Sequence, residues 1–297
     1  MITANEATYR EWERDMRGRR LSEWTLVKHR RALEQLERAA GERDLLTLAK
    51  ADIQDWVASM ADRAPSGVMN RFSSVRAFYN WAEGEELLTR SPMHRLKAPQ
   101  NPPPLIEIPD VDDVRAILKA CAVRSDFEGR RDASLVRILC EPGSPRASEA
   151  ANIAVADVDL SRDDLKVIRG KGGKSRVMPL GAVTAQSVSR YLRIRARHPK
   201  AGLPQLFVGT GGRGPMTRSG VGGILQRRSD QARVARIHPH QLRHLAAHRF
   251  FLAGGREGDA MRLFGWDDPA MPRLYAAAAA ATRAVDAARV MALGDEL

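Results

Sequence analysis

The sequence is poor in cysteine and contains no long apolar run. Its two cysteines, Cys121 and Cys140, each lie in an apolar, helix-like segment of the 297-residue chain. Two cysteines without a Cys-x-x-Cys pair exclude a disulfide framework and the common cysteine zinc pattern, so we expect two buried, reduced thiols. No stretch reaches the roughly 18 apolar residues of a membrane span, and residues 1–20 lack the apolar core of a secretion signal. These absences predict a cytoplasmic protein with no membrane partner.

Acidic residues are fewer than basic residues. The chain has 48 Lys and Arg against 36 Asp and Glu, a net charge of +12, and a pI near 10.3. The counts are 17 against 15 in residues 1–99 and 31 against 21 in residues 100–297, so the second part carries most of the excess. Such a balance predicts a polyanionic partner, with nucleic acid as the first candidate. General solubility is the alternative explanation, because net charge informs association and not fold.

A proline-rich segment divides the chain. Residues 96–109 read LKAPQNPPPLIEIP, without helical or strand periodicity, which is typical of a stiff, extended linker. A length of 297 residues favours two domains over a single core. We therefore predict a first domain over residues 1–98, a linker over 99–109 and a second domain over 110–297.

Apolar periodicity predicts a mainly helical chain with one small β-sheet. In the first domain Ser22 is a candidate N-cap for a helix over 22–39, further helices are expected over 51–62 and from Ser66, and four or five helices are expected in all. In the second domain the expected helices are 110–123, 127–140, a short one from Arg146 to about 153, 181–197, 218–233, 239–253 and an alanine-rich terminal helix over 276–293. Two β-rich runs, 165–169 and 176–180, flank a glycine-rich turn and predict a hairpin.

Two arginines suit phosphate chemistry. A phosphoryl-transfer centre needs cationic groups on the non-bridging oxygens, a nucleophile in line, and an acid for the leaving oxygen. The planar guanidinium binds phosphate oxygens through two hydrogen bonds and stays charged, which makes Arg146 and Arg243 candidates. Arg146 follows Gly143 and Pro145 into a short helix, and a helix N-terminus favours anions. An arginine on a solvated surface is the alternative for each.

Histidines and lysines supply candidate proton donors and acceptors. His240 and His244 are four residues apart and share a helical face, but no Glu or third ligand completes a metal site. Beside Arg243, a histidine that orients a phosphate or moves a proton fits better. Lys171 and Lys174 both lie in the hairpin turn, and the residues alone do not choose between them.

Four tyrosines are candidate nucleophiles. Tyr79 belongs to the apolar stripe of the helix that begins near Ser66, Tyr191 lies in an amphipathic helix, and Tyr9 lies near a terminus that we expect to be frayed. Tyr275 follows a loop with two prolines and precedes the alanine run, downstream of His240. A core tyrosine is the alternative for Tyr275.

Six ordered elements together resemble the tyrosine recombinase, or phage integrase, family. They are Arg146–Glu149, the hairpin lysine Lys171, the His-x-Leu-Arg-His box His240–His244, Leu263–Trp266, Tyr275 nine residues later, and in the first domain Thr25–Leu33 with Asn70–Trp81. The chain departs from the family pattern at Gly143–Pro145, after His244 and at Phe264, and Trp266 replaces the more frequent histidine. None of these departures removes a reacting group.

The resemblance implies a helical core-binding domain, a mixed α+β catalytic domain, and strand cleavage through a 3′-phosphotyrosyl intermediate without cofactor or metal. The nucleophile would be Tyr275, and Arg146 and Arg243 would stabilise the transition state. By the same resemblance Lys171 would protonate the leaving oxygen, His240 would assist proton transfer, and Trp266 would pack and donate its indole N–H.

Double-stranded DNA is the implied partner. Candidate contacts are the basic residues Lys28, Arg30, Arg31, Arg71, Arg76 and Lys174. The terminal helix resembles the family's element that docks on a neighbouring subunit, which implies a tetramer on two DNA sites, and an accessory directionality factor is a further expected partner.

Within the family, the sequence favours an integrase of a phage or mobile element. The chain ends in ALGDEL, and helical sequence begins within about 20 residues, which leaves no room for a domain that binds arm-type sites. A Xer-like resolvase, a type IB topoisomerase-like enzyme and a non-catalytic DNA-binding regulator are the alternatives.

Overall fold

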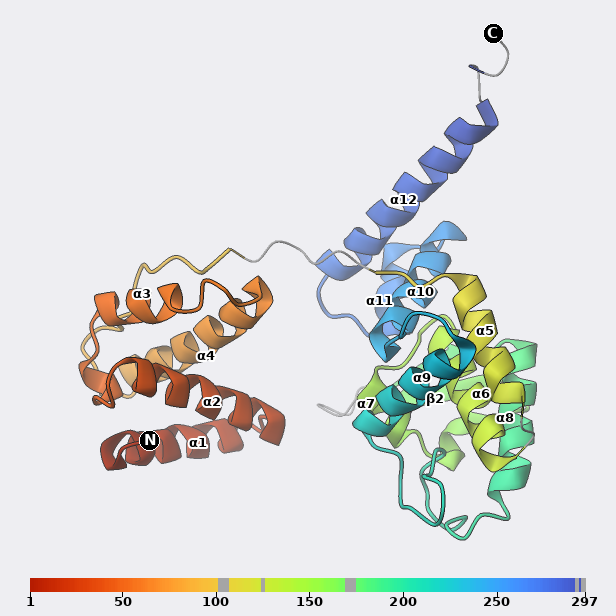
Figure 1. Cartoon of the computed structure of the whole chain (residues 1–297), viewed down its shortest axis with the longest axis horizontal. Helices are drawn as coiled ribbons and strands as arrows, with labels where there is room; N and C mark the ends of the chain where they lie inside the picture. The colour runs from red at the N-terminus through yellow and green to blue at the C-terminus, as the bar shows by residue number, and fades with distance from the viewer. Residues whose placement is uncertain (101–106, 124–125, 169–174, 292–293, 295–297) are drawn as a thin grey trace. The chain divides into compact units, whose positions relative to one another are not determined.

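The chain forms two compact units that are both mainly helical. The computed structural model describes residues 1–100, 107–123, 126–168, 175–291 and 294. Its two units are Met1–Pro104 and Leu105–Leu297 (Figure 1). The predicted fold class, mainly α with a small sheet, is confirmed. Among the described helices, none is long and apolar enough to cross a membrane.

The first unit consists of helices joined by short turns. They are α1 (Thr3–Gly18), α2 (Glu23–Ala39), α3 (Lys50–Ala58) and α4 (Pro65–Gly84), with a 3₁₀ turn at Leu45–Thr47. Helix α2 begins where the sequence predicted, because the Ser22 side chain accepts a hydrogen bond from the Thr25 backbone N–H at 3.2 Å. Helix α4 begins at Pro65, whose fixed φ suits a first helical turn.

The expectation that Tyr9 lies in a frayed terminus is wrong. Tyr9 is 2% exposed, and its hydroxyl donates to the Leu26 carbonyl at 3.2 Å. Its ring meets Trp12 edge to face, with centroids 6.3 Å apart. Tyr9, Trp12 and Met16 recur at three- and four-residue spacing and form one buried face of α1, although most residues around them are polar. The charged composition of this segment concealed its apolar stripe.

The second unit places helices around a three-stranded sheet. Its helices are α5 (Val111–Ala122), α6 (Phe127–Cys140), α7 (Ala147–Asn152), α8 (Ala182–Arg195), α9 (Arg218–Ala232), α10 (Pro239–Leu252), α11 (Glu257–Phe264) and α12 (Ala270–Met291), with a 3₁₀ turn at Val155–Asp157. The strands are β1 (Val158–Asp159), β2 (Asp164–Ile168) and β3 (Ser175–Pro179), antiparallel in the order β1-β2-β3. The predicted hairpin is present with Lys166 opposite Val177, whereas β1 has two residues, too few for a periodic signal.

Helix α12 begins earlier than the sequence predicted. It starts at Ala270, so Tyr275 lies on the helix and not in a loop before it. Pro272 lies in the first turn, where the backbone N–H has no intrahelical acceptor, and a proline there does not break the helix. Beyond residue 281 the side chains of α12 are mostly exposed, and this end projects from the rest of its unit (Figure 1).

Two apolar clusters hold the second unit together. The larger joins α5, α6, α8, α9 and the sheet, and it includes Leu135, Val167 and Tyr191, all fully buried. The Tyr191 hydroxyl donates to the Leu206 carbonyl at 3.0 Å, which confirms its packing role. The smaller cluster joins α10, α11 and α12 around Phe264 and Tyr275. Both cysteines are free thiols; Cys121 is buried, as expected, and Cys140 is partly buried.

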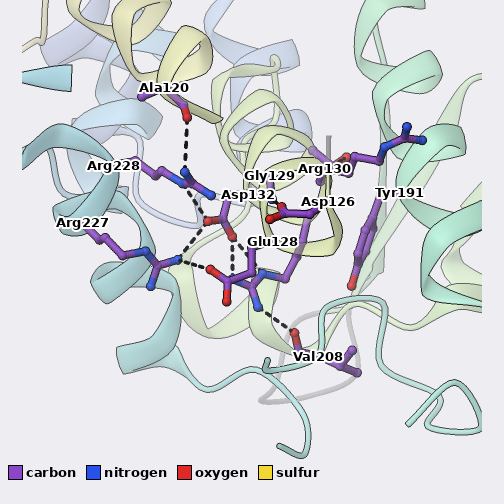
Figure 2. Close-up of polar contacts among 12 residues, drawn as sticks. Ala120, Asp126, Glu128, Gly129, Arg130, Asp132, Tyr191, Val208, Arg227 and Arg228 are labelled. Carbon is purple, nitrogen blue, oxygen red and sulfur yellow. Dashed lines mark hydrogen bonds and ion pairs between the residues drawn. The ribbon is translucent and has the colours of Figure 1, made fainter. Parts of the chain in front are cut away.

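A buried carboxylate ties three helices of this unit together (Figure 2). Asp132 on α6 is fully buried and accepts hydrogen bonds from Arg131 at 2.8 Å and from Arg227 and Arg228, on α9, at 2.9 Å each. Arg131 also donates to the Val208 carbonyl and Arg228 to the Ala120 carbonyl at the end of α5, both at 3.2 Å. Because these donors and acceptors satisfy one another, the network offsets the desolvation of its charges.

Replacing Asp132 by Asn should destabilise this unit strongly. The change leaves two buried guanidinium groups without a counter-charge, and we expect a loss of about 3–5 kcal/mol in opening free energy. Hydrogen exchange of the α6 and α9 amides in the full chain measures this loss. Asp112→Asn is the matched control: its side chain is 79% exposed and pairs with the 67% exposed Arg115, so a loss under about 1 kcal/mol is expected. Equal losses in the two variants would contradict the role given to Asp132.

Candidate active site

A tight turn places Arg146 at the start of α7. Gly143 has a φ of +88°, and a Cβ there would lie 3.0 Å from the Leu263 carbonyl oxygen, so only glycine fits between α6 and the end of α11. Arg146 is the N-cap of α7, as the sequence predicted. Its guanidinium donates to Glu149 at 2.9 Å and to the Gly265 carbonyl at 3.5 Å, and its side chain is 38% exposed.

Glu149 is the carboxylate that holds two arginines in place. It accepts the Arg146 backbone N–H at 2.9 Å and the Arg146 guanidinium, and it also accepts Arg176 of β3 at 2.8 Å. Arg176 donates further to the Gly143 carbonyl at 3.2 Å. Burial alone would raise the pKa of Glu149, but the hydrogen bonds from Arg176 and Arg146 outweigh it and lower the pKa below its ordinary value. Glu149 is therefore ionised at neutral pH.

Arg243 lies deepest in the site. It is 2% exposed, and its guanidinium donates to the carbonyls of Ser144 and Phe264. The same group lies over the ring of Trp266, 5.7 Å from its centroid. Burial, followed by the charges of Arg146 and Arg176, lowers the pKa of Arg243 to about 9, so it stays protonated at neutral pH. The site therefore presents several positive charges held by backbone carbonyls and one carboxylate.

Tyr275 lies in an aromatic stack beside these charges. Its ring is parallel to that of Trp266, with centroids 5.3 Å apart and planes 6° apart, and Trp266 stacks in turn on Phe264 at 4.8 Å. Tyr275 is 1% exposed. Burial raises the pKa of its hydroxyl to about 12, although the positive charge of Arg243 acts in the opposite direction. Tyr275 is thus a protonated phenol in this structure.

Two histidines of α10 line the same region. His244 hydrogen-bonds through Nδ1 to the Tyr275 hydroxyl, and the His240 ring packs edge to face on the His244 ring at 4.1 Å. Burial, then the charges of His240 and Arg243, lower the pKa of His244 to about 4. Burial, then Arg243 and Arg146, lower that of His240. Among the described residues no group of three His, Cys, Asp or Glu side chains lies close enough together to hold a metal ion.

The structure brings together most of the residues that the sequence singled out for chemistry. Arg146, His240, Arg243, Trp266 and Tyr275 converge on one region through the contacts given above. The two hairpin lysines, at positions 171 and 174, lie in the sequence between β2 and β3 and fall outside the described residues.

Sequence reasoning missed two groups of the site, Arg176 and the contact from His244 to Tyr275. The strand alternation contains a signal for the first, because Arg176 and the fully buried Met178 lie on the same face of β3. The contact from His244 to Tyr275 could be predicted only by placing Tyr275 on a helix that packs beside α10. The sequence contains no local signal for that packing.

In the first unit, three of the predicted DNA contacts line a single groove of about 960 Å³ between α2 and α4: Lys28, Arg31 and Arg71. Arg38 and Arg63 line it too, together with an exposed aromatic ring, Trp24, which is 65% exposed. The groove therefore combines five basic side chains with an exposed aromatic surface.

The other two predicted contacts of this unit bind within the protein. Arg30 forms ion pairs with Glu6 at 2.7 Å and Glu34 at 3.0 Å. Arg76 donates to the Leu96 carbonyl and lies over the ring of Phe72 at 4.6 Å. Neither lines the groove.

Family comparisons cover both units. A model of the phage integrase family matches residues 109–282, and a model of the phage integrase N-terminal SAM-like domain matches residues 10–86. The tyrosine recombinase XerC of Pseudomonas aeruginosa is 30% identical over 86% of this chain and 85% of that protein. XerC of Alcanivorax borkumensis is 28% identical over 86% and 84%, and XerD of Bifidobacterium longum 27% over 80% of each.

Solved structures share the fold. The Tn1549 transposon integrase in complex with transposon right end DNA aligns with a TM-score of 0.73 at 18% identity, over 93% of this chain and 98% of that one. A lambda integrase dimer bound to a COC′ core site aligns with a TM-score of 0.71 at 15% identity, over 91% and 94%.

Replacing Glu149 by Gln should remove part of the acid sensitivity of folding. The folded-state pKa of Glu149 lies below its ordinary value of 4.5, so its stabilising contribution is complete above pH 4.5 and is lost as the pH falls through the lowered pKa. We expect the variant to lose about 1–3 kcal/mol of unfolding free energy at pH 7, and a smaller amount at pH 3. Urea unfolding at both pH values measures the difference. The 44% exposed Glu128, changed to Gln, is the control, and a loss independent of pH would contradict the prediction.

Proposed function

The chain belongs to the phage integrase family of tyrosine recombinases, and on that premise we propose that it cuts and rejoins DNA at specific sites with Tyr275 as the nucleophile. One observation carries the assignment of residues: the Tyr275 ring lies in a stack with Trp266, over which the Arg243 guanidinium is held. A phenol beside fixed cationic groups is what attack on a phosphodiester requires.

In the proposed reaction, the Tyr275 oxygen attacks the scissile phosphorus and the bond to the 5′ oxygen breaks, which leaves a 3′-phosphotyrosyl link. Arg146 and Arg243 hydrogen-bond the non-bridging oxygens, where charge develops in the transition state. Lys171 protonates the leaving oxygen. A free 5′-hydroxyl of another strand reverses these steps, so the phosphodiester energy is retained and no nucleotide cofactor is required.

The buried state of Tyr275 implies a rearrangement on DNA binding. A side chain that is 1% exposed does not meet a phosphate without movement of α12 or of the segment before it. Residues 254–269, between α10 and α12, carry only the short helix α11, and Gly254 and Gly265 in them have positive φ. This segment is where a change in backbone angles would expose the tyrosine to the phosphate.

Two biological roles fit this chemistry. The sequence favours integration or excision of a phage or mobile element. The curated relatives reported above are named XerC and XerD, which supports a Xer-like resolving role as the second candidate. Strand exchange between two copies of a site is common to both roles.

We further propose action as a tetramer on two DNA sites in the cytoplasm, with an accessory directionality factor. Support for subunit docking comes from the end of α12, where Val285, Val290 and Met291 are 52%, 89% and 70% exposed. Apolar side chains in such a projecting helix suit burial against a neighbouring subunit.

A covalent adduct with DNA tests the nucleophile. The wild-type protein, incubated with a nicked duplex that carries its candidate site, should give a band that survives denaturation, because the phosphotyrosyl bond is covalent. Tyr275→Phe should bind the duplex with unchanged affinity and give no band, since it lacks the attacking oxygen. Tyr191→Phe, altered in a packed core tyrosine, is the matched control and should retain the band. An adduct with Tyr275→Phe would remove Tyr275 from its proposed role.

The salt dependence of duplex binding tests whether the groove of the first unit contacts DNA phosphates. Changing Lys28 and Arg31 to Ala should weaken duplex binding and reduce the slope of log K against log salt by about 1.8, because each phosphate contact releases about 0.9 counterion. Fluorescence anisotropy at several salt concentrations measures the slope. Arg10→Ala with Arg19→Ala removes the same charge from α1, where the side chains are 68% and 65% exposed. Equal slopes for the two double variants would argue against binding in the groove.

A further inference from the structure

The Tyr275 hydroxyl has a histidine partner, and that histidine is not the first one of the His-x-Leu-Arg-His box. Nδ1 of His244 is hydrogen-bonded to the Tyr275 oxygen, and the two ring centroids are 5.5 Å apart. The first histidine, His240, has no hydrogen bond to Tyr275 among the described residues, and its ring instead packs on that of His244. Proton transfer from the phenol therefore has a direct acceptor one helical turn further along α10.

The protonation states of this pair limit the hydrogen bonds that it can form. His244 is neutral at pH 7, because burial and the nearby charges disfavour its imidazolium form, and Tyr275 is a protonated phenol. Tyr275 can donate to Nδ1 only when the His244 proton lies on Nε2. In that tautomer the phenol O–H is directed at an unprotonated ring nitrogen, which is the arrangement that general base catalysis needs.

From this contact we infer that His244 is the general base that accepts the proton of Tyr275 during strand cleavage, an inference that rests on the proposed function. As the Tyr275 oxygen bonds to phosphorus, its O–H bond breaks and the proton moves to Nδ1 of His244. The electron pair of the breaking P–O bond leaves with the 5′ oxygen, which takes a separate proton from Lys171. His244 returns its proton to the tyrosine when the 5′-hydroxyl of the rejoining strand displaces it.

The groups around His244 account for how a buried imidazole can become charged. Arg243 and His240 face it from its own helix, and Tyr275 faces it from α12. Burial, followed by the charges of His240 and Arg243, keeps His244 neutral at rest. A bound phosphate adds negative charge beside Arg243, which reduces this repulsion and raises the proton affinity of His244. DNA binding therefore activates the base as it supplies the electrophile.

The variant His244→Asn removes proton transfer but keeps a side chain that can hold Tyr275 in position. The Asn side-chain oxygen can accept the Tyr275 hydrogen bond, but an amide does not take up the proton. We expect single-turnover adduct formation on the nicked duplex to fall by about 10²-fold or more, the usual contribution of a general base, with duplex affinity unchanged. His248→Asn, one turn further along α10, should keep the wild-type rate. A wild-type rate in His244→Asn would overturn the inference while leaving the adduct assignment of Tyr275 intact.

Replacing Tyr275 by a more acidic phenol tests whether the rate lost in His244→Asn is lost at proton transfer. With 3,5-difluorotyrosine at position 275, the nucleophile ionises without a strong base, so most of the rate lost in His244→Asn should return. The same replacement should restore little in Arg146→Ala, where phosphate binding is damaged. Failure of the difluorophenol to rescue His244→Asn would reduce His244 to a structural role and overturn its assignment as the base.

An NMR measurement without DNA tests the hydrogen bond between His244 and Tyr275 independently of catalytic activity. In ¹⁵N-labelled protein, the His244 ring should show a protonated Nε2 and a hydrogen-bonded, unprotonated Nδ1, and Tyr275→Phe should shift the Nδ1 resonance alone. A protonated Nδ1, or a spectrum unchanged by Tyr275→Phe, would overturn the inference whatever the enzyme does. Should wild-type protein bind duplex yet form no adduct, the proposed function fails and the catalytic role of His244 fails with it.

Discussion

The site depends on holding several guanidinium groups together without bound DNA. Like charges repel, and Arg146, Arg176 and Arg243 lie close enough for the first two to lower the pKa of the third. Glu149 compensates part of this charge, and backbone carbonyls compensate the rest: Arg243 binds those of Ser144 and Phe264, Arg176 that of Gly143 and Arg146 that of Gly265. These carbonyls belong to two short segments, 143–144 and 264–265. The hydrogen bonds that these arginines form therefore fix the positions of α7, β3 and the end of α11 relative to one another.

Whether a feature could be predicted from the sequence depends on whether its physical cause is local or tertiary. Features with a local cause were predicted well: Ser22 caps α2, the two β-rich runs pair as the antiparallel strands β2 and β3, and Arg146 follows a Gly-x-Pro sequence into α7. Features with a tertiary cause were missed. Arg176 faces inward because Glu149, 27 residues earlier in the chain, accepts it, and Tyr275 lies on a helix because α12 packs against α10. The strand alternation around Arg176 indicates its inward face but not its partner, and no window of sequence around Tyr275 indicates the packing of its helix.

The first unit shows why a small net charge does not describe a binding surface. Its counts of basic and acidic residues are nearly equal, yet the groove between α2 and α4 presents five basic side chains. The two carboxylates that line the groove bind basic residues outside its lining: Glu34 pairs with Arg30 and Glu23 with Arg17. Internal pairing therefore leaves an uncompensated positive surface, and the two predicted contacts that do not line it, Arg30 and Arg76, are held by partners within the unit.

The proposed nucleophile is protected by the groups that would activate it. In the described structure the Tyr275 phenol is buried, stacked on Trp266 and hydrogen-bonded to His244, and burial raises its pKa to about 12. A phenol in this state is a poor nucleophile, and no phosphate reaches it. In the proposed reaction, binding of a DNA phosphate beside Arg243 changes both conditions at once, since it requires the segment that covers the tyrosine to move and adds the negative charge that His244 needs to accept a proton. In the proposed reaction, cleavage is then confined to the complex with DNA by electrostatics as well as by access, and an unbound protomer carries the Tyr275–His244 pair in its neutral form.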